Sequence, residues 1–277
     1  MHYFKRILGG FGCILIFLAL IVSACNKETQ TPAVNNIRHV SVYVTANASL
    51  YTAVFMDIQK VEVATDTSSA FSNKNSYHSD TLWNTLAMSP GVYNISSLKN
   101  GLDTLLASGN ITGSLKSIRL TLGNRNTVLY KGNRYPLQLQ TGSKAITVQV
   151  GPEQQDGAGT NQIETWMNFE VSKSIIPDGE RFYLKPVFKP FNLTNFGSIE
   201  GRVEPADAIK AVVVYNEQDT TTVVPDKSGA FILHGLRAGT YQVTYKALTS
   251  NKDITLTNIQ VQNGRKTNIA SVPLNLK

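Results

Sequence analysis

Residues 54–63 have the sequence Val-Phe-Met-Asp-Ile-Gln-Lys-Val-Glu-Val, in which apolar side chains recur at alternate positions. Val54, Met56 and Ile58 fall on one face of an extended chain, and Val61 and Val63 continue the apolar series. Because successive side chains of a β-strand point to opposite faces, this pattern predicts a strand with one buried face.

The same alternation recurs in residues 40–44, 118–122 and 167–171. A hairpin is predicted across Lys131-Gly132-Asn133, where glycine and asparagine tolerate the backbone conformation of a tight turn. Strands are therefore expected almost throughout this part of the chain.

Two segments depart from the alternation. Thr65–Asp80 is rich in serine, threonine and asparagine, which predicts a polar loop. Gly101–Gly109 contains consecutive apolar residues, and we expect a short helix there.

A second compact part is expected from Gly197 onward, after a short linker at Pro190–Asn195. It contains seven or eight strand-like segments and a tight-turn sequence at Asp226–Gly229. Phe231 and Tyr241 are expected in its core. The chain is thus predicted to be all-β, with two antiparallel β-sandwich domains at residues 38–192 and 197–277.

The N-terminus carries a signal for export. Lys5 and Arg6 precede the apolar run Cys13–Val22, and the segment Leu20–Cys25 ends Val-Ser-Ala-Cys, the pattern of a bacterial lipobox. We expect cleavage between Ala24 and Cys25 and lipidation of Cys25, which gives a signal peptide at 1–24 and a lipidated linker at 25–37. Two or three acyl chains would anchor the protein firmly to a membrane.

Two alternatives to this interpretation are weaker. The ten apolar residues of Cys13–Val22 cover about 15 Å of helix, whereas a transmembrane helix must cross about 30 Å of hydrocarbon. A plain secretory signal does not explain the cysteine at the first mature position.

Lys27-Glu28 resembles a short signal that sends lipoproteins to the outer face of the outer membrane in one large group of Gram-negative bacteria. A solvated linker explains the same two residues. The expected location is the outer membrane, lipid-anchored and facing the cell exterior.

Charge and cysteine content limit the partners. The mature chain has 24 basic and 19 acidic residues, with no basic run longer than two, which does not favour nucleic acid. Its single cysteine is Cys25, so no disulfide within the mature chain is available. The partners expected besides the membrane are polysaccharide, anionic lipid or another surface protein.

Both predicted domains resemble known families. Residues 38–192 resemble a bacterial lipoprotein domain family of unknown function, DUF4382, through the segments Phe55–Val63, Ser117–Gly123, Phe169–Ile176 and Tyr183–Val187, although the loop at 65–80 is longer and more polar than the family pattern. Residues 197–277 resemble the carboxypeptidase regulatory-like (transthyretin-type) β domains, through Gly201–Val203, Asp226–Phe231 and Gly235–Tyr241. The first resemblance implies a surface lipoprotein, and the second a spacer or ligand-binding module.

The sequence contains no recognisable catalytic or metal-binding motif. The mature histidines His39, His78 and His234 are isolated, with no pair at zinc-ligand spacing. Glu153, Asp156, Asn161 and Glu164 gather oxygen atoms around a glycine-rich loop, but without the spacing of a calcium loop. We therefore expect no metal, no cofactor and no enzymatic activity.

Candidate binding residues come from the aromatic side chains, because indole faces stack on sugar rings. Trp166, with Asn168 and Gln162, is a possible glycan contact if its face of the strand is solvated, and burial of Trp166 is the favoured alternative. Tyr215, with Asn216 and Gln218, is a weaker set.

The leading hypothesis is a lipid-anchored surface protein with a non-catalytic binding or scaffolding role. The alternatives are a carbohydrate-binding surface lipoprotein and a fimbria-like structural subunit, matured by an Arg-directed cut at Arg38.

The lipobox gives a direct prediction. Cys25→Ala should abolish incorporation of labelled fatty acid and leave the precursor uncleaved, because the modified thiol is absent. Metabolic labelling followed by immunoprecipitation measures both. Label entering the Cys25→Ala protein would contradict the assignment.

Overall fold

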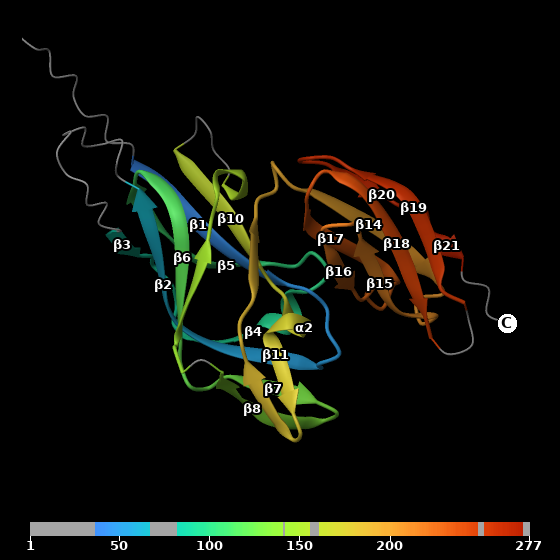
Figure 1. Ribbon diagram of the computed structural model, residues 1–277, viewed down its shortest axis with the longest axis horizontal. Helices are drawn as coiled ribbons and strands as arrows, with labels where there is room; N and C mark the ends of the chain where they lie inside the picture. Colours follow the sequence, from blue (N-terminus) through green and yellow to red (C-terminus); the bar gives the residue numbers. More distant parts are fainter. Residues whose placement is uncertain (1–36, 67–81, 141, 156–160, 249–251, 274–277) are drawn as a thin grey trace, which may run out of the picture. The chain divides into compact units, whose positions relative to one another are not determined.

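The computed structural model describes residues 37–66, 82–140, 142–155, 161–248 and 252–273, which lie within one compact unit, Asn35–Lys277 (Figure 1). The predictions for the signal peptide, for Cys25 and for nearly all of the linker lie outside the described residues, as does most of the predicted loop at 65–80. Within the described chain, no helix is long and apolar enough to cross a membrane.

Strands dominate the described residues, which confirms the all-β class. The first part consists of β1 (Ile37–Ala46), β2 (Ala53–Asp66), β3 (Leu82–Thr85), β4 (Gly91–Asn94), β5 (Thr104–Thr112), β6 (Ser114–Leu122), β7 (Thr127–Tyr130), β8 (Asn133–Leu139), β9 (Ala145–Gln149), β10 (Gln162–Phe169), β11 (Ile175–Asp178), β12 (Arg181–Leu184) and β13 (Phe188–Phe191), with the short helices η1 (Ile95–Leu98), η2 (Pro152–Gln154) and α2 (Val171–Ser174).

These strands form two sheets with one apolar core. The smaller sheet has the order β13-β10-β1-β5; the larger has the order β11-β12-β8-β7-β2-β6-β9, with β3 and β4 also paired to β2. The alternating apolar residues of β1, β2, β6 and β10 form the core, as predicted.

Not every pair of neighbouring strands is antiparallel. β1 runs parallel to β10, and β8 runs parallel to β12. Parallel neighbours need a long crossover, and many residues separate the members of each of these pairs. The expected antiparallel pairing holds for the other strand pairs described in these two sheets.

A bulge in β2 explains the uneven apolar spacing of its sequence. The pairing of β2 with β6 shifts register between Ile58 and Lys60, so one extra residue separates them. Ile58 and Val61 therefore both face the core, while Lys60 and Glu62 face outward.

Asp57 connects β2 to the turn between β6 and β7. Its carboxylate accepts hydrogen bonds from the side chain and backbone N–H of Arg125 and from Gln59, while its backbone N–H donates to Asn126 and its carbonyl accepts from Gly123. A Cβ at Gly123 would lie 2.1 Å from Asp57 Oδ2, so only glycine fits there. The Asp57 side chain is 3% exposed, whereas that of Arg125 is 67% exposed.

The second part consists of β14 (Gly197–Glu204), β15 (Ile209–Tyr215), β16 (Thr220–Val223), β17 (Ala230–Leu236), β18 (Gly239–Ala247), β19 (Ile254–Val261), β20 (Lys266–Asn268) and β21 (Val272–Pro273). One sheet has the order β17-β14-β20, with β21 also paired to β14, and the other has the order β16-β15-β18-β19. β14 runs parallel to β20 and β21.

The core of this sandwich contains Phe231 and Tyr241, as predicted, and the rings of Phe231 and Tyr245 meet edge to face. The predicted turn is confirmed, because Asp226 accepts hydrogen bonds from the backbone of Ser228 and Ala230 and Gly229 has a φ of 81°. β16 was not expected from the sequence.

Two local predictions were wrong. Residues 104–112 form strand β5 rather than a short helix, with Leu105 half exposed and Leu106 buried. Pro190 and Phe191 belong to β13 rather than to a linker, because β13 pairs with β10 through Phe191.

The buried carboxylate predicts how stability depends on pH. Hydrogen bonds from Arg125 lower the pKa of Asp57 from its ordinary value of 3.8, against burial, which acts to raise it. Because the pKa is lower in the folded protein, the stabilisation is present above about pH 4 and is lost as the pH falls through the folded pKa.

Asp57→Asn should therefore lower the unfolding free energy at neutral pH by about 1.5–3 kcal/mol, and this deficit should shrink below about pH 4. Urea unfolding of the mature protein across this pH range measures it. Asp178→Asn, at an exposed position of the β11–β12 hairpin, is the control. A deficit that stays constant down to pH 2 would contradict the assignment.

Candidate functional site

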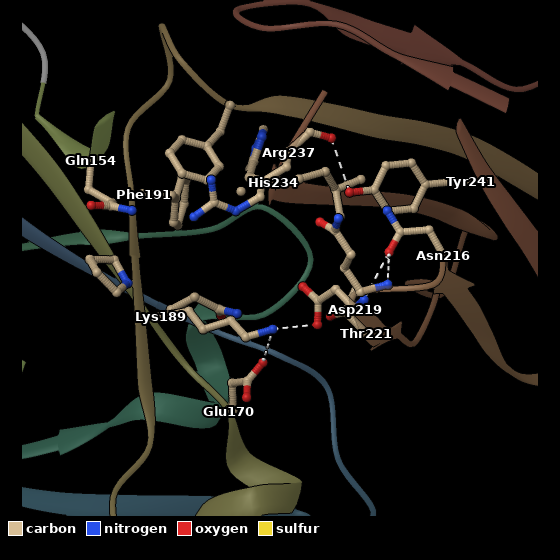
Figure 2. Close-up of a pocket in the computed structure, with 16 residues that line it drawn as sticks. Gln154, Glu170, Lys189, Phe191, Asn216, Asp219, Thr221, His234, Arg237 and Tyr241 are labelled. Atoms are coloured by element: carbon tan, nitrogen blue, oxygen red, sulfur yellow. Dashed lines mark hydrogen bonds and ion pairs between the residues drawn. The ribbon is translucent and has the colours of Figure 1, made fainter. Parts of the chain in front are cut away.

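A pocket of about 290 Å³ is lined by residues of both sandwiches (Figure 2). The first sandwich contributes residues of β10, η2 and β13 and the residue that precedes α2. The second contributes the β15–β16 loop, strands β16–β18 and the β17–β18 turn, and one further residue comes from the connection between the sandwiches. The lining residues are Gln154, Asn168, Glu170, Lys189, Pro190, Phe191, Phe196, Asn216, Gln218, Asp219, Thr221, His234, Gly235, Leu236, Arg237 and Tyr241.

Glu170 is fixed by the helical turn that follows it. Its backbone N–H donates to Val187, and its carbonyl accepts the hydroxyl of Ser174, which in turn accepts the backbone N–H of Val187. This turn places the Glu170 side chain in a nearly buried position, 4% exposed.

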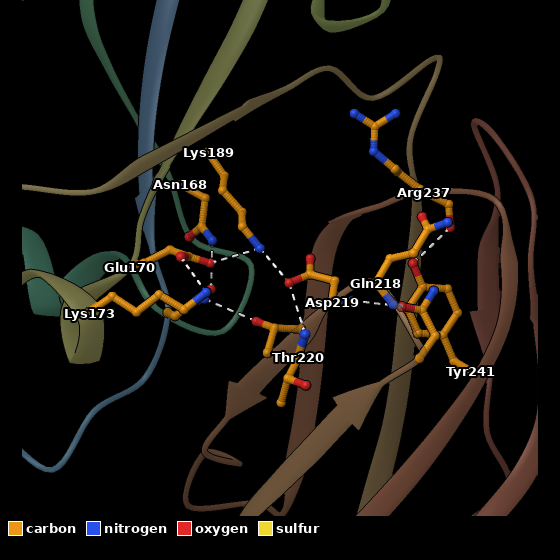
Figure 3. A network of polar contacts seen from close by, with 12 residues as sticks. Asn168, Glu170, Lys173, Lys189, Gln218, Asp219, Thr220, Arg237 and Tyr241 are labelled. Atoms are coloured by element: carbon orange, nitrogen blue, oxygen red, sulfur yellow. Dashed lines mark hydrogen bonds and ion pairs between the residues drawn. The ribbon is translucent and has the colours of Figure 1, made fainter. Parts of the chain in front are cut away.

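Lys189 connects the two sandwiches at this point. Figure 3 shows its ammonium group between Glu170, at 3.0 Å, and Asp219 of the second sandwich. Lys173 lies 2.8 Å from the other oxygen of Glu170. Burial acts to lower the pKa of Lys189, but the bonds to Asp219 and Glu170 outweigh it and raise the pKa.

Asp219 is held in place by a turn of its own loop. The side-chain oxygen of Asn216 accepts the backbone N–H groups of Gln218 and Asp219. Such a turn fixes a short polar loop without a regular element, and here it presents the carboxylate of Asp219 to Lys189.

A second ion pair joins the sandwiches. Arg237 donates to both carboxylate oxygens of Glu153, at 3.0 and 2.6 Å, and this pairing lowers the pKa of Glu153. Asn192 and Asn195, in the connection between the sandwiches, both donate to the carbonyl of Glu153. These hydrogen bonds fix the connection between the sandwiches against η2.

An aromatic row lies behind the pocket. Tyr43 stacks on Trp166 with ring centroids 4.7 Å apart, Trp166 lies against Phe191, and Phe191 meets Phe196 edge to face. Trp166 is 7% exposed, and its indole N–H donates to Asp103. The interpretation of Trp166 as a solvated stacking platform is therefore wrong; its face of the strand is covered, which was the favoured alternative.

The other predicted contact residues are distributed over separate places. Asn168 lines the pocket and donates to Asn47, whereas Gln162 is exposed at the start of β10, and neither it nor Tyr215 is among the lining residues. The hydroxyl of Tyr215 donates to Gln242.

Two lining side chains make no hydrogen bond within the described part of the chain: the imidazole of His234 and the amide of Gln218. Burial lowers the pKa of His234, and nearby Lys266 acts in the same direction. At neutral pH His234 therefore presents a neutral imidazole to the pocket.

The arrangement suits recognition of an uncharged polar molecule. Lys189 and Arg237 are each paired with carboxylates, so an ionic ligand would have to displace one of them, whereas His234 and Gln218 have hydrogen-bonding capacity to spare. No local motif could have revealed the charged set, because its members come from separate segments.

Comparisons with known proteins identify the first sandwich. The DUF4382 family, a domain of unknown function, matches residues 39–186. This match covers more than half of the chain, so the chain belongs to the DUF4382 family. No curated protein matches the sequence.

Solved structures give only distant likenesses. A leucine-rich repeat protein from Bacteroides thetaiotaomicron is 14% identical over 87% of this chain and 27% of its own, with a TM-score of 0.20. The minor pilin of Streptococcus agalactiae is 8% identical over 86% and 97%, with a TM-score of 0.22. A fimbrial protein from Bacteroides ovatus is 11% identical over 88% and 51%, with a TM-score of 0.25. The chain spans about a quarter of the first protein and half of the third, and TM-scores this low carry no argument about function.

The two ion pairs should differ in strength. Glu170 is 4% exposed in its pair with Lys189, whereas Glu153 and Arg237 are both more than half exposed. A double-mutant cycle of Lys189→Met with Glu170→Gln should give a coupling of about 1–3 kcal/mol in urea unfolding. The matched cycle of Arg237→Met with Glu153→Gln should give at most about 1 kcal/mol. Equal couplings would show that burial does not distinguish the pairs.

Proposed function

We propose that the protein is a lipid-anchored outer-membrane or cell-surface protein with a non-catalytic binding or scaffolding role. The lipobox at Leu20–Cys25 supports the anchor, and Lys27-Glu28 supports the surface location. Cleavage before Cys25 would leave the linker 25–37 between the lipid and β1.

The observation that carries the non-catalytic role is the position of Lys189 between Glu170 and Asp219. A general acid or base must be able to exchange its proton with a substrate. Here the charged groups of the pocket are engaged in ion pairs across the two sandwiches, an arrangement that favours holding them together. A fixed pocket between two sandwiches suits a binding or spacing module.

We further propose that residues 197–277 are a carboxypeptidase regulatory-like β domain. Gly201 supports this, because a Cβ there would lie 2.8 Å from the buried ring of Phe231, so the Gly-Arg-Val segment of the resemblance needs its glycine. The turn at Asp226–Gly229 directly precedes β17, the strand that contains Phe231.

Carbohydrate binding is the alternative that the pocket favours specifically. The unbonded imidazole of His234 and the unbonded amide of Gln218 match the hydroxyl groups of a neutral sugar. Because the aromatic rings of the pocket are largely buried, hydrogen bonds rather than stacking would dominate such a contact.

The fimbria-like alternative depends on where a cut would fall. Arg38 was expected ahead of the first strand, but it lies within β1 and pairs with Ile111 of β5. After a cut at Arg38, residues 39–46 would remain between β10 and β5, so no groove would open among the described strands.

Surface location is tested with the signal residues themselves. The double variant Lys27→Ala/Glu28→Ala should keep its lipid but lose accessibility to protease on intact Gram-negative cells, because the sorting signal is gone. Thr29→Ala/Gln30→Ala is the matched control. Unchanged accessibility of the first variant would contradict the surface assignment.

The non-catalytic role is tested separately, by assaying the purified mature protein with hydrolase substrates. Turnover of any of them would contradict this role.

A further inference from the structure

The segment 104–152 has a one-sided charge. It contains six basic residues, Lys116, Arg119, Arg125, Lys131, Arg134 and Lys144, and no acidic residue. The mature chain has 24 basic and 19 acidic residues, so this long acid-free segment concentrates positive charge in strands β6–β9 and the turns between them.

The pleat of the large sheet brings part of this charge to one face. Phe55, Asp57, Lys60 and Glu62 all point outward from β2, because the bulge after Ile58 restores the outward position of Lys60 and Glu62. Residues 55–62 include one bulge residue, so they span about six strand steps of about 3.3 Å, which makes this row roughly 20 Å long.

Lys60 is itself a cation, and each of the other three outward residues is associated with one. Arg134 lies over the ring of Phe55, Arg125 binds Asp57, and Arg119 and Lys60 both bind Glu62. We call Lys60, Arg119, Arg125 and Arg134 the cationic face.

The carboxylates lie beneath their partners. The side chains of Asp57 and Glu62 are 3% and 9% exposed, whereas those of Arg125 and Lys60 are 67% and 46% exposed. Arg134 is exposed as well. A solvent-borne ligand therefore meets three exposed cations, with the partly exposed Arg119 (28%) beside them and the two compensating acids beneath.

We propose that this face binds an acidic polysaccharide, one that carries carboxylate or sulfate groups. The complementarity is of charge and shape, because the cations follow one extended strand and a linear polyanion can lie along it. The hydroxyls of Thr121 and Thr127, on strands that pair with the row, add groups that match sugar hydroxyls.

Nucleic acid fits this face less well. Single-stranded nucleic acid is held largely by bases that stack on open aromatic rings. Here the rings of Phe55 and Trp83 each carry a guanidinium group, from Arg134 and Arg119, with the latter 3.8 Å from the ring centroid. The face lies on a different surface from the pocket and does not depend on it.

Binding of polygalacturonate and chondroitin sulfate to the mature protein, measured by affinity electrophoresis at low and high salt, tests the proposal. Lys60→Gln/Arg134→Gln should weaken binding about three- to tenfold and reduce its salt dependence. Both partners of these residues keep other contacts: Glu62 retains Arg119, and Phe55 stays in the sheet. The control Lys210→Gln/Lys227→Gln removes the same charge from exposed positions of the second sandwich and should change affinity less than twofold.

Neutral dextran, single-stranded DNA and vesicles containing phosphatidylglycerol are the comparison ligands. Binding of either acidic polysaccharide that the face variant weakens and the control does not, with dextran unbound, supports the proposal. It is overturned if the wild type binds neither acidic polysaccharide, if both variants behave alike, or if DNA or vesicles bind as tightly as the polysaccharides. Unfolding curves confirm that both variants are folded, and Arg119→Gln offers a second site on the same face.

Discussion

The carboxylate of Asp57, held below Arg125, is the contact on which the larger sheet depends. β2 is the strand that β3, β4, β6 and β7 all pair with, and the ladder changes partner from β6 to β7 at Asp57. At that point the backbone of Asp57 bonds to Gly123 and to the side chain of Asn126, so the main-chain groups between the two partner strands stay satisfied. A buried carboxylate is costly unless it is paired, and here pairing also fixes where β6 ends.

The contact between the sandwiches also depends on polar groups that find partners across it. Asn100 shows it on a small scale, because its amide accepts from the backbone N–H of Ile232 and donates to the carbonyl of Ala230, as a neighbouring strand would. Gly101 follows with a φ of 79°, and a Cβ there would lie 2.2 Å from the side chain of Ile232. The bonds of Asn100 and the ion pair of Lys189 are directional, so they specify one arrangement of the two sandwiches. An apolar contact of similar size would allow one sandwich to slide over the other.

Much of the fold was predictable because alternation reports directly on burial. Even the bulge is visible in the sequence, as the three-residue step from Ile58 to Val61. β5 was not predictable in the same way, because a register shift in its pairing with β1 interrupts the alternation and leaves the adjacent Leu106 and Ala107 both buried. Trp166 shows the limit for the site. Alternation placed its side chain on the outer face correctly, but only the packing of Phe191 and Phe196 decides that this face is covered.

For the charged residues too, one part can be predicted from the sequence and the other depends on the fold. That residues 104–152 lack acids can be counted in the sequence, but the face on which the cations gather depends on the pleat of β2 and its bulge. The pocket is the opposite case, since Glu170, Lys189 and Asp219 have no common pattern and meet only through the connection of the sandwiches. In both places carboxylates are buried under cations. At Lys189 the ammonium group lies between two carboxylates, Glu170 and Asp219, so the charges cancel and hold the two sandwiches together. At Arg125 the guanidinium group is 67% exposed above a single carboxylate that is 3% exposed, so the pairing leaves positive charge at the surface that we propose as a binding face.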